Sequence, residues 1–156
     1  MNKFVYFGTP DFSTLVLDRL VDAGYTPALV VTAPDKRAGR GLVLTASSVK
    51  NWAIAHGVKV FQPTTFDDTA ARELRATHGD FAIVAAFGKI LPAHILDLFS
   101  KGMLNVHPSL LPRYRGTSPV ESQILADETL VGVSVILMDE KMDHGPVIAQ
   151  ERVTIP

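Results

Sequence analysis

Asn105 and His107 end a short apolar segment that reads Met-Leu-Asn-Val-His over residues 103–107. An apolar run of this kind predicts a buried strand, and side chains two residues apart on a strand point to the same face. Asn105 and His107 would therefore lie side by side where the strand ends. An amide N–H can donate to an oxygen that develops negative charge, and an imidazole can relay a proton or, when protonated, stabilise that charge. The pair is typical of a site for acyl transfer.

A carboxylate that could complete this site follows at Asp143, in a loop between two expected strands. A carboxylate can orient an imidazole and stabilise its protonated form. Spacing alone leaves a purely structural interpretation equally open. In that interpretation Asn105 is a strand-end turn residue, His107 is a capped histidine, and Asp143 belongs to a turn before Gly145.

Other classes of site are less favoured by the sequence. A Ser–His–Asp hydrolase could use Ser109, His107 and Asp143, but the sequence has no G-x-S-x-G turn to present the serine. A dinucleotide site would need G-x-G-x-x-G after the first strand, where the chain has only Gly8. The sequence also holds no cysteine and no H-x-x-x-H, which argues against a zinc site.

The elements that must position these residues alternate between strand and helix. Strands are expected over residues 3–7, 27–32, 58–61, 81–86, 103–106, 131–137 and 147–154. Helices are expected to begin at Thr9-Pro10, at Ser47 or Ser48, near residues 69 and 92, and at a capping box formed by Ser118 and Glu121. Residues 33–46 are expected to form a long loop. The alternation predicts an α/β fold, a mostly parallel sheet with helices on both faces, which binds ligands beyond the carboxyl ends of its strands.

The composition fits one folded domain. The chain has 156 residues, of which 47% are hydrophobic and 20% are charged, a balance opposite to that of disordered chains. A net charge of -1 provides no overall attraction for nucleic acid. Lys36, Arg37 and Arg40 in the long loop could form a local patch that meets phosphates, and a solvated surface loop is nearly as good an interpretation. No apolar run is long enough for a membrane span or a secretory signal, so we expect a cytoplasmic protein.

Three motifs together resemble those of the folate-dependent formyltransferase superfamily. They are Asn105-Val106-His107 after a strand, the loop over residues 109–112 followed by Arg115-Gly116, and Asp143-His144-Gly145 before the last strand. Within this superfamily, residues 7–13 (FGTPDFS) and 34–41 (PDKRAGRG) resemble the branch that formylates methionyl-tRNA. The resemblance spans essentially the whole chain.

The resemblance implies a Rossmann-like domain over residues 1–156, the N-terminal catalytic domain of such an enzyme, apparently truncated at its C-terminal end and without the C-terminal tRNA-binding domain. It implies that Asn105, His107 and Asp143 are catalytic and that no metal is needed. The formyl donor would be 10-formyltetrahydrofolate, and the acceptor would be the α-amine of initiator methionyl-tRNA. The implied binding residues are Phe87, Gly88, Lys89, Ile90, Leu91, Met138, Asp139 and Met142 for folate, Ser109, Leu110, Leu111, Pro112, Arg115 and Gly116 for the substrate, and Lys36, Arg37 and Arg40 for tRNA.

Several alternatives stay open beside this interpretation. The acceptor could be an amino sugar nucleotide or glycinamide ribonucleotide, the reaction could be hydrolysis of formyltetrahydrofolate, or the chain could be a folate-binding module without catalysis. Two residues depart from the family pattern: Leu42 follows the glycine-rich loop where relatives often carry lysine, and His144 stands where a small residue or threonine is common. Residues 147–154 are expected to expose an apolar sheet face that relatives cover with a further helix. The sequence does not set the oligomeric state.

Overall fold

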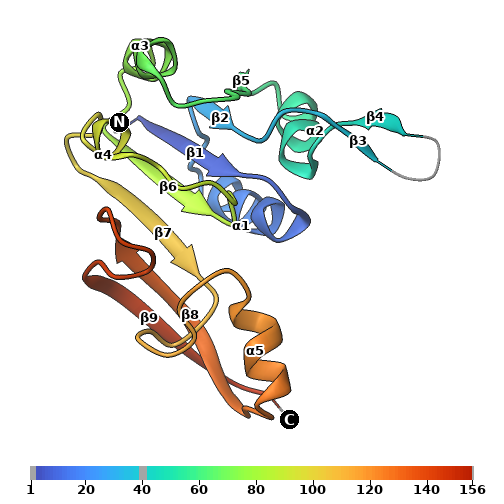
Figure 1. The fold of residues 1–156 in the computed structure, drawn as a ribbon, viewed down its shortest axis with the longest axis vertical. Helices are drawn as coiled ribbons and strands as arrows, with labels where there is room; N and C mark the ends of the chain where they lie inside the picture. The colour runs from blue at the N-terminus through green and yellow to red at the C-terminus, as the bar shows by residue number, and fades with distance from the viewer. Residues whose placement is uncertain (1–2, 39–41, 156) are drawn as a thin grey trace.

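The computed structural model describes residues 3–38 and 42–155 (Figure 1). Its main sheet has the strand order β5-β2-β1-β6-β7-β8-β9 in this part of the chain. The strands are β1 (Phe4–Gly8), β2 (Leu29–Val31), β5 (Val60–Phe61), β6 (Phe81–Ala85), β7 (Met103–His107), β8 (Leu130–Leu137) and β9 (Val147–Thr154). Neighbours from β5 to β7 pair in parallel, and β8 runs antiparallel to both β7 and β9. The predicted α/β class with a mostly parallel sheet is confirmed.

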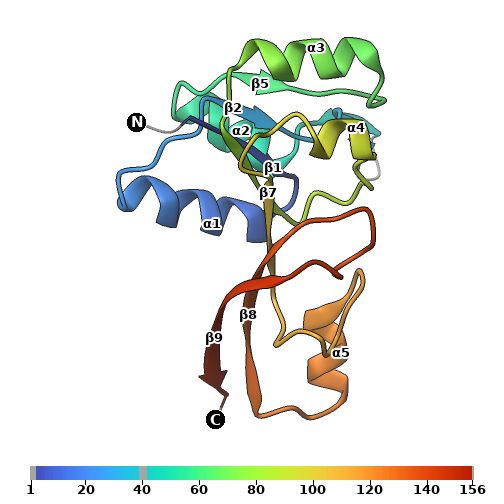
Figure 2. The same cartoon turned by 90° about the vertical axis from the view of Figure 1, so that its left-hand side faces the viewer.

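Helices cover both faces of the parallel part of the sheet (Figure 2). The helices are α1 (Asp11–Asp22), α2 (Ser48–Ala55), α3 (Asp68–Ala76), α4 (Ala93–Leu96) and α5 (Pro119–Leu125). One buried apolar cluster joins the sheet to α3 and α4, and a second joins it to α1 and α2.

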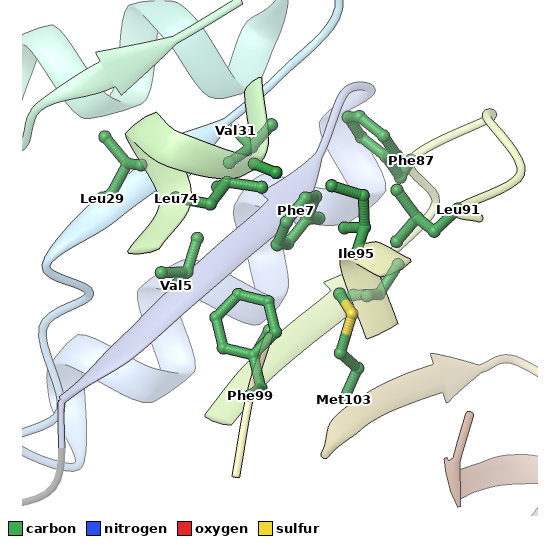
Figure 3. Packing of buried hydrophobic residues seen from close by; sticks show 13 residues of the cluster. Val5, Phe7, Leu29, Val31, Leu74, Phe87, Leu91, Ile95, Phe99 and Met103 are labelled. Carbon is green, nitrogen blue, oxygen red and sulfur yellow. The ribbon is translucent and has the colours of Figure 1, made fainter. Parts of the chain in front are cut away.

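Alternate side chains of β1 supply both clusters. Val5 and Phe7 pack with Leu74 of α3 in the first cluster (Figure 3), whereas Phe4 and Tyr6 belong to the second. All four are at most 3% exposed, because helices bury the strand from both sides. This double burial explains why the strand reads as a continuous apolar run.

The start of α1 differs from the prediction by one position. Pro10 occupies the N-cap position and the helix begins at Asp11, so Thr9 lies outside the helix. The Thr9 hydroxyl instead donates to the carbonyl oxygen of Phe87 at 3.1 Å. This bond ties the end of β1 to the segment after β6, where the predicted site lies.

Two further helix starts confirm one prediction and correct another. Ser47 caps α2 by accepting a hydrogen bond from the Lys50 backbone N–H at 3.0 Å. Ser118 stands before α5, but its side chain makes no capping hydrogen bond, so the predicted capping box is wrong. The backbone of Ser118, with φ -133° and ψ 53°, departs from the extended geometry of a usual N-cap.

The expected loop over residues 33–46 contains a β-hairpin, β3 (Lys36–Ala38) and β4 (Val43–Thr45). Asp35 anchors its base, because the carboxylate accepts hydrogen bonds from Lys50 Nζ at 2.6 Å and from Gln62 Nε2 at 2.7 Å. The two strands pair through backbone groups, and the side chains of β4 are exposed, so apolar periodicity does not reveal them. Arg40 lies outside the described residues.

The chain divides into a layered region, residues 3–107, and a C-terminal arm, residues 108–155. Figures 1 and 2 show β8, β9 and α5 extending away from the helices that sandwich the parallel strands. Side chains of β8 alternate in burial, and β9 is exposed along its length. The expected exposure of an apolar strand over residues 147–154 is confirmed: Val147, Ile148 and Val153 are 44%, 59% and 50% exposed.

Steric constraints explain why residue 132 of β8 is a glycine. A Cβ atom at this position would collide with the carbonyl oxygen of Glu151 on β9 and with the side chain of Leu110. The glycine therefore lets the loop after β7 and the last strand both approach β8. Across the described ranges, no helix has the length and apolar character to cross a bilayer.

Candidate active site

Asn105, His107 and Asp143 meet at the end of β7. Asn105 Nδ2 donates to Asp143 Oδ1 at 3.2 Å, and His107 Nδ1 lies 3.6 Å from the same oxygen. The first two residues come from one face of β7, and the third comes from the loop between β8 and β9. The expectation that the period of a strand places Asn105 and His107 together is confirmed, and the catalytic role of the three residues stays a prediction.

The hydrogen bonds of His107 define which nitrogen can exchange a proton. A carbonyl oxygen can only accept, so His107 Nε2, 2.8 Å from the Tyr114 carbonyl oxygen, carries a hydrogen and donates it. His107 Nδ1 then faces Asp143. Protonation adds a hydrogen at Nδ1, and the new N–H points toward the carboxylate. The imidazole can therefore take up and release a proton at one defined atom.

The Asn105 amide can bind an oxygen atom of a ligand. Its nitrogen faces the carboxylate because a carboxylate oxygen accepts and the amide oxygen cannot donate. The amide nitrogen carries two hydrogens, and one of them serves the bond to Asp143. The second can be donated to an oxygen of a bound molecule, which is the property that an oxyanion site requires.

Asp143 is held by the backbone as well as by side chains. The Gly116 N–H donates to Asp143 Oδ2 at 2.9 Å. Gly116 has φ +104°, in a region that favours glycine, which explains this residue type at a turn aimed at the carboxylate. The side chains of His107 and Asp143 are 5% and 9% exposed, so their charges interact with little screening by water.

The loop after His107 is fixed by buried polar groups. The Ser109 hydroxyl donates to the Arg113 carbonyl at 2.7 Å, and the Ser109 carbonyl accepts from Ser134 Oγ at 2.6 Å. Ser134 Oγ also accepts from the Leu111 N–H at 3.0 Å and from Gln150 Nε2 at 2.9 Å. These contacts hold the loop in place from β8 and β9.

The six predicted substrate residues divide between scaffold and surface. Ser109 and Leu111 are buried in this network, and Leu110 packs against β8 at Gly132. Pro112 and Arg115 are exposed, and Gly116 contributes its backbone N–H to Asp143. Their role in binding the substrate stays a prediction.

The first group of predicted folate residues surrounds the end of β6. Phe87 and Leu91 are buried in the cluster below α3 and α4, and Gly88 and Ile90 are exposed. Lys89 donates from Nζ to the Pro63 and Thr64 carbonyl oxygens at 2.9 and 3.1 Å. Lys89 thus holds the loop before α3.

The second group of predicted folate residues lies near the beginning of the loop that carries Asp143. The Met138 side chain is partly buried against the α3/α4 cluster, and Met142 is 53% exposed. Asp139 accepts hydrogen bonds from the Lys141 N–H at 2.8 Å and from His144 Nδ1 at 2.7 Å. The hydrogen bond from His144 contributes most to lowering the pKa of Asp139 below its usual value. The His144–Asp139 contact therefore bridges this loop across five residues.

The predicted tRNA residues Lys36 and Arg37 lie on β3, outside the trio of Asn105, His107 and Asp143. A pocket of about 210 Å³ lies beside the hairpin and is lined by Thr9, Lys36 and Ser47, among others. A larger groove of about 800 Å³ has none of the trio in its lining, which includes Lys3, His56 and Lys59. We place the candidate site at the trio because it combines the buried donors and the carboxylate, which the larger groove does not.

Sequence reasoning missed the backbone groups and the buried polar side chains that support the trio. The Tyr114 carbonyl and the Gly116 N–H could not be assigned without the loop conformation. Ser134 left a visible signal, a hydroxyl at an inward position of the otherwise apolar strand β8. In the described part of the chain, no group of three or more His, Cys, Asp or Glu side chains could hold a metal ion.

Known proteins resemble this chain over nearly its whole length. The family model described as formyl transferase matches residues 2–156. A methionyl-tRNA formyltransferase of Chloroflexus aggregans is 47% identical over 155 residues, covering 99% of this chain and 50% of the relative. A methionyl-tRNA formyltransferase of Agathobacter rectalis is 44% identical over 154 residues, covering 98% of this chain and 50% of the relative.

A solved structure supports the same fold. The phosphoribosylglycinamide formyltransferase of Bacillus halodurans superposes with a TM-score of 0.80 at 24% identity, covering 99% of this chain and 81% of that chain. The present chain spans about half the length of the curated relatives that it matches. The resemblance drawn from the three motifs is confirmed over nearly the whole sequence, and the chain belongs to the formyl transferase family.

Proposed function

We propose that this chain carries the site that transfers a formyl group from 10-formyltetrahydrofolate to the α-amine of initiator methionyl-tRNA. The observation that carries the proposal is the convergence of Asn105 Nδ2 and His107 Nδ1 on one oxygen of Asp143. An amide donor, an imidazole and a carboxylate are the groups that acyl transfer to an amine needs. The names of the relatives support methionyl-tRNA as the acceptor.

The proposed reaction moves one formyl group and one proton. The amine nitrogen attacks the formyl carbon, and the formyl oxygen becomes an oxyanion that the Asn105 amide and protonated His107 stabilise. Asp143 accepts the proton that the amine loses. The oxyanion then returns to a carbonyl as the bond from the formyl carbon to the folate nitrogen breaks, and that nitrogen takes up the proton that Asp143 received. The products are the N-formylated amine and tetrahydrofolate.

The folate is proposed to lie between the segment after β6 and the loop after β8. Gly88 and Ile90 on one side and Met142 on the other are exposed, and Phe87 is fixed below them by the Thr9 hydroxyl. Gly88 is exposed and has φ +76°, a conformation that favours glycine at this turn. This arrangement supports binding mostly through backbone groups.

The β3–β4 hairpin is proposed to contact the tRNA. Lys36 and Arg37 give it positive charge, and Asp35 holds its base to Lys50 and Gln62. The Gln62 and Lys50 hydrogen bonds keep the pKa of Asp35 below its usual value, so the anchor is charged at neutral pH. A pocket of about 210 Å³ lies beside the hairpin, with Thr9, Lys36 and Ser47 in its lining, and we propose that it receives part of the tRNA.

The test is the mass of the amino acid released from methionyl-tRNA after incubation with 10-formyltetrahydrofolate. A gain of one formyl group that His107→Ala abolishes would support the proposal. His78→Asn is the matched control, since His78 is exposed at the end of α3 and asparagine tolerates its φ of +52°. Formylation of glycinamide ribonucleotide instead, release of tetrahydrofolate without an acceptor, or folate binding without any product would each contradict the proposal.

A further inference from the structure

Glu128 joins two side chains that no step of the proposed reaction uses. The Tyr114 hydroxyl donates to Glu128 Oε1 at 2.6 Å, and the Arg113 guanidinium forms an ion pair with the same carboxylate. The Arg113 guanidinium also lies 5.1 Å from the centre of the Tyr114 ring. The Glu128 side chain is 19% exposed, compared with 59% for Arg113, so the carboxylate is the enclosed partner of this cluster.

The backbone of the same two residues touches the trio. The Tyr114 carbonyl accepts the hydrogen bond from His107 Nε2, and the Arg113 carbonyl accepts from Ser109 Oγ. Two residues after Tyr114, the Gly116 N–H donates to Asp143. One short segment therefore sets both the tautomer of His107 and the direction of Asp143.

That segment has a backbone conformation that requires support. Tyr114 has φ +57°, in the left-handed region that a bulky residue adopts only when its surroundings hold it there. The Tyr114 side chain is held by Glu128, whose own backbone N–H donates to the Gln123 carbonyl at 3.1 Å. Gln123 in turn donates from Nε2 to the Pro108 carbonyl at 2.9 Å. The carboxylate is thus fixed relative to the residue that directly follows His107.

We propose that Glu128 is a positioning residue, which holds Tyr114 so that its carbonyl keeps His107 in the Nε2–H form with Nδ1 facing Asp143. The consequence for catalysis rests on the proposed function, whereas the effect on the imidazole does not. Hydrogen bonds from Tyr114 and from Arg113 keep the pKa of Glu128 below its usual value, so the carboxylate is charged at neutral pH. The Arg113–Glu128 ion pair alone would not let Glu128 influence His107, because exposed ion pairs contribute little to stability. The contact that carries the influence is the hydrogen bond from the Tyr114 hydroxyl.

The direct test is ¹⁵N NMR of the histidine side chains at neutral pH. In the unaltered chain we expect His107 as the Nε2–H tautomer with a slowly exchanging Nε2 proton. Glu128→Ala and Tyr114→Phe should each produce a mixture of tautomers and at least tenfold faster exchange of that proton. Glu128→Gln keeps an acceptor for the tyrosine hydroxyl and should give an intermediate result. Glu121→Ala, at an exposed glutamate on α5, is the matched control.

The double variant Tyr114→Phe/Glu128→Ala tests whether the two residues act through one contact. It should exchange the His107 proton no faster than the more affected single variant, since residues in one network are not additive. Circular dichroism shows whether each variant is folded, and Tyr114→Phe removes only one oxygen atom. A folded Glu128→Ala or Tyr114→Phe chain with the tautomer and proton exchange of the unaltered chain would overturn the proposal.

Kinetics separate this inference from the proposed function. If the unaltered chain transfers the formyl group, Glu128→Ala should lower kcat about tenfold with KM for the folate changed less than twofold, because the reacting groups are misplaced while the folate contacts remain. An unchanged kcat in that variant would overturn the positioning role. Absence of transfer by the unaltered chain would count against the proposed function, and the NMR result would still decide the role of Glu128.

Discussion

The layered region and the C-terminal arm are stabilised in different ways. In the layered region, two apolar clusters fill both sides of the sheet, with side chains such as Val5 and Leu17 completely buried. Beyond residue 107, the buried apolar side chains among the described residues are few: Leu111, Pro119 and Ile136. The arm is organised instead by hydrogen bonds around Ser134. Burial of apolar surface is non-directional, whereas a hydrogen-bond network specifies the position of each atom.

The candidate site lies where these two regions meet. Asn105 and His107 end the last strand of the layered region, and Asp143 and Gly116 belong to the arm. The apolar layers therefore fix one half of the site, and the polar network of the arm aligns the other half with it. A substitution in the apolar layers should therefore displace Asn105 and His107, whereas a substitution in the polar network should displace Asp143.

The largest expected effect is on catalysis, from one residue of each region. His107→Ala and Asp143→Asn should each lower kcat/KM about a hundredfold or more, because each removes a group that stabilises charge or moves a proton. The double variant should be about as active as the weaker single variant, since groups that act as a unit are not additive. Steady-state kinetics on folded proteins measure this. Independent, multiplying losses would show that the two regions do not form one site.

The next effect contrasts a buried side chain of the layered region with an exposed side chain of the arm. Leu74→Ala should lower the free energy of unfolding by about 3 kcal/mol, because Leu74 is 1% exposed inside the α3/α4 cluster. Ile124→Ala on α5 should change it by less than about 0.5 kcal/mol, because Ile124 is 68% exposed. Urea denaturation of both variants gives the comparison. Equal losses would mean that α5 belongs to a buried core.

A smaller loss should follow from the network of the arm. Ser134→Ala leaves the Leu111 N–H and the Ser109 carbonyl without their partner and should cost about 2 kcal/mol of unfolding free energy. The same variant should also reduce kcat, since the loop it supports carries the Tyr114 carbonyl. Ser122→Ala, at an exposed serine of α5, is the control. An unchanged unfolding free energy in Ser134→Ala would contradict the conclusion that hydrogen bonds around Ser134 stabilise the arm.

The smallest effect concerns the first turns of α3 and α5. Asp67 accepts hydrogen bonds from the Thr69 and Ala70 N–H groups, and the bond from Ala70 is the main cause that lowers the pKa of Asp67. The stability from this charge is present above the ordinary value of 3.8 and is lost as the pH falls through the lower pKa of the folded chain. Asp67→Asn should flatten the fall of unfolding free energy in this acid range.

Ser118→Ala provides the counterpart in the arm. It should leave stability unchanged at every pH, because the Ser118 side chain makes no capping bond. Thermal unfolding between pH 2 and pH 7 follows both variants. If the stability of Asp67→Asn depends on pH as that of the unaltered chain does, the charge of Asp67 does not contribute to stability.

The sequence predicts the parts of the molecule whose physics is periodic. The apolar runs place β8 and β9 within one residue of the observed bounds, and the two-residue period places Asn105 beside His107. The β3–β4 hairpin escapes prediction because it pairs through backbone groups in a segment rich in charge, Pro and Gly. The Tyr114 carbonyl and the Gly116 N–H escape for a related reason, since every residue has such groups and only the loop conformation selects these two.

The exposed edge of β9 has a consequence for assembly between copies. A strand at the edge of a sheet can template pairing with another chain. In β9 the charged residues Glu151 and Arg152 interrupt the apolar ends of the strand, which shortens any run able to build a fibril. In an antiparallel pair of two such strands, the register that sets Glu151 opposite Arg152 matches opposite charges at both positions, and neighbouring registers do not. The charges therefore favour an antiparallel pair of two β9 strands in a single register over the addition of further strands to a fibril.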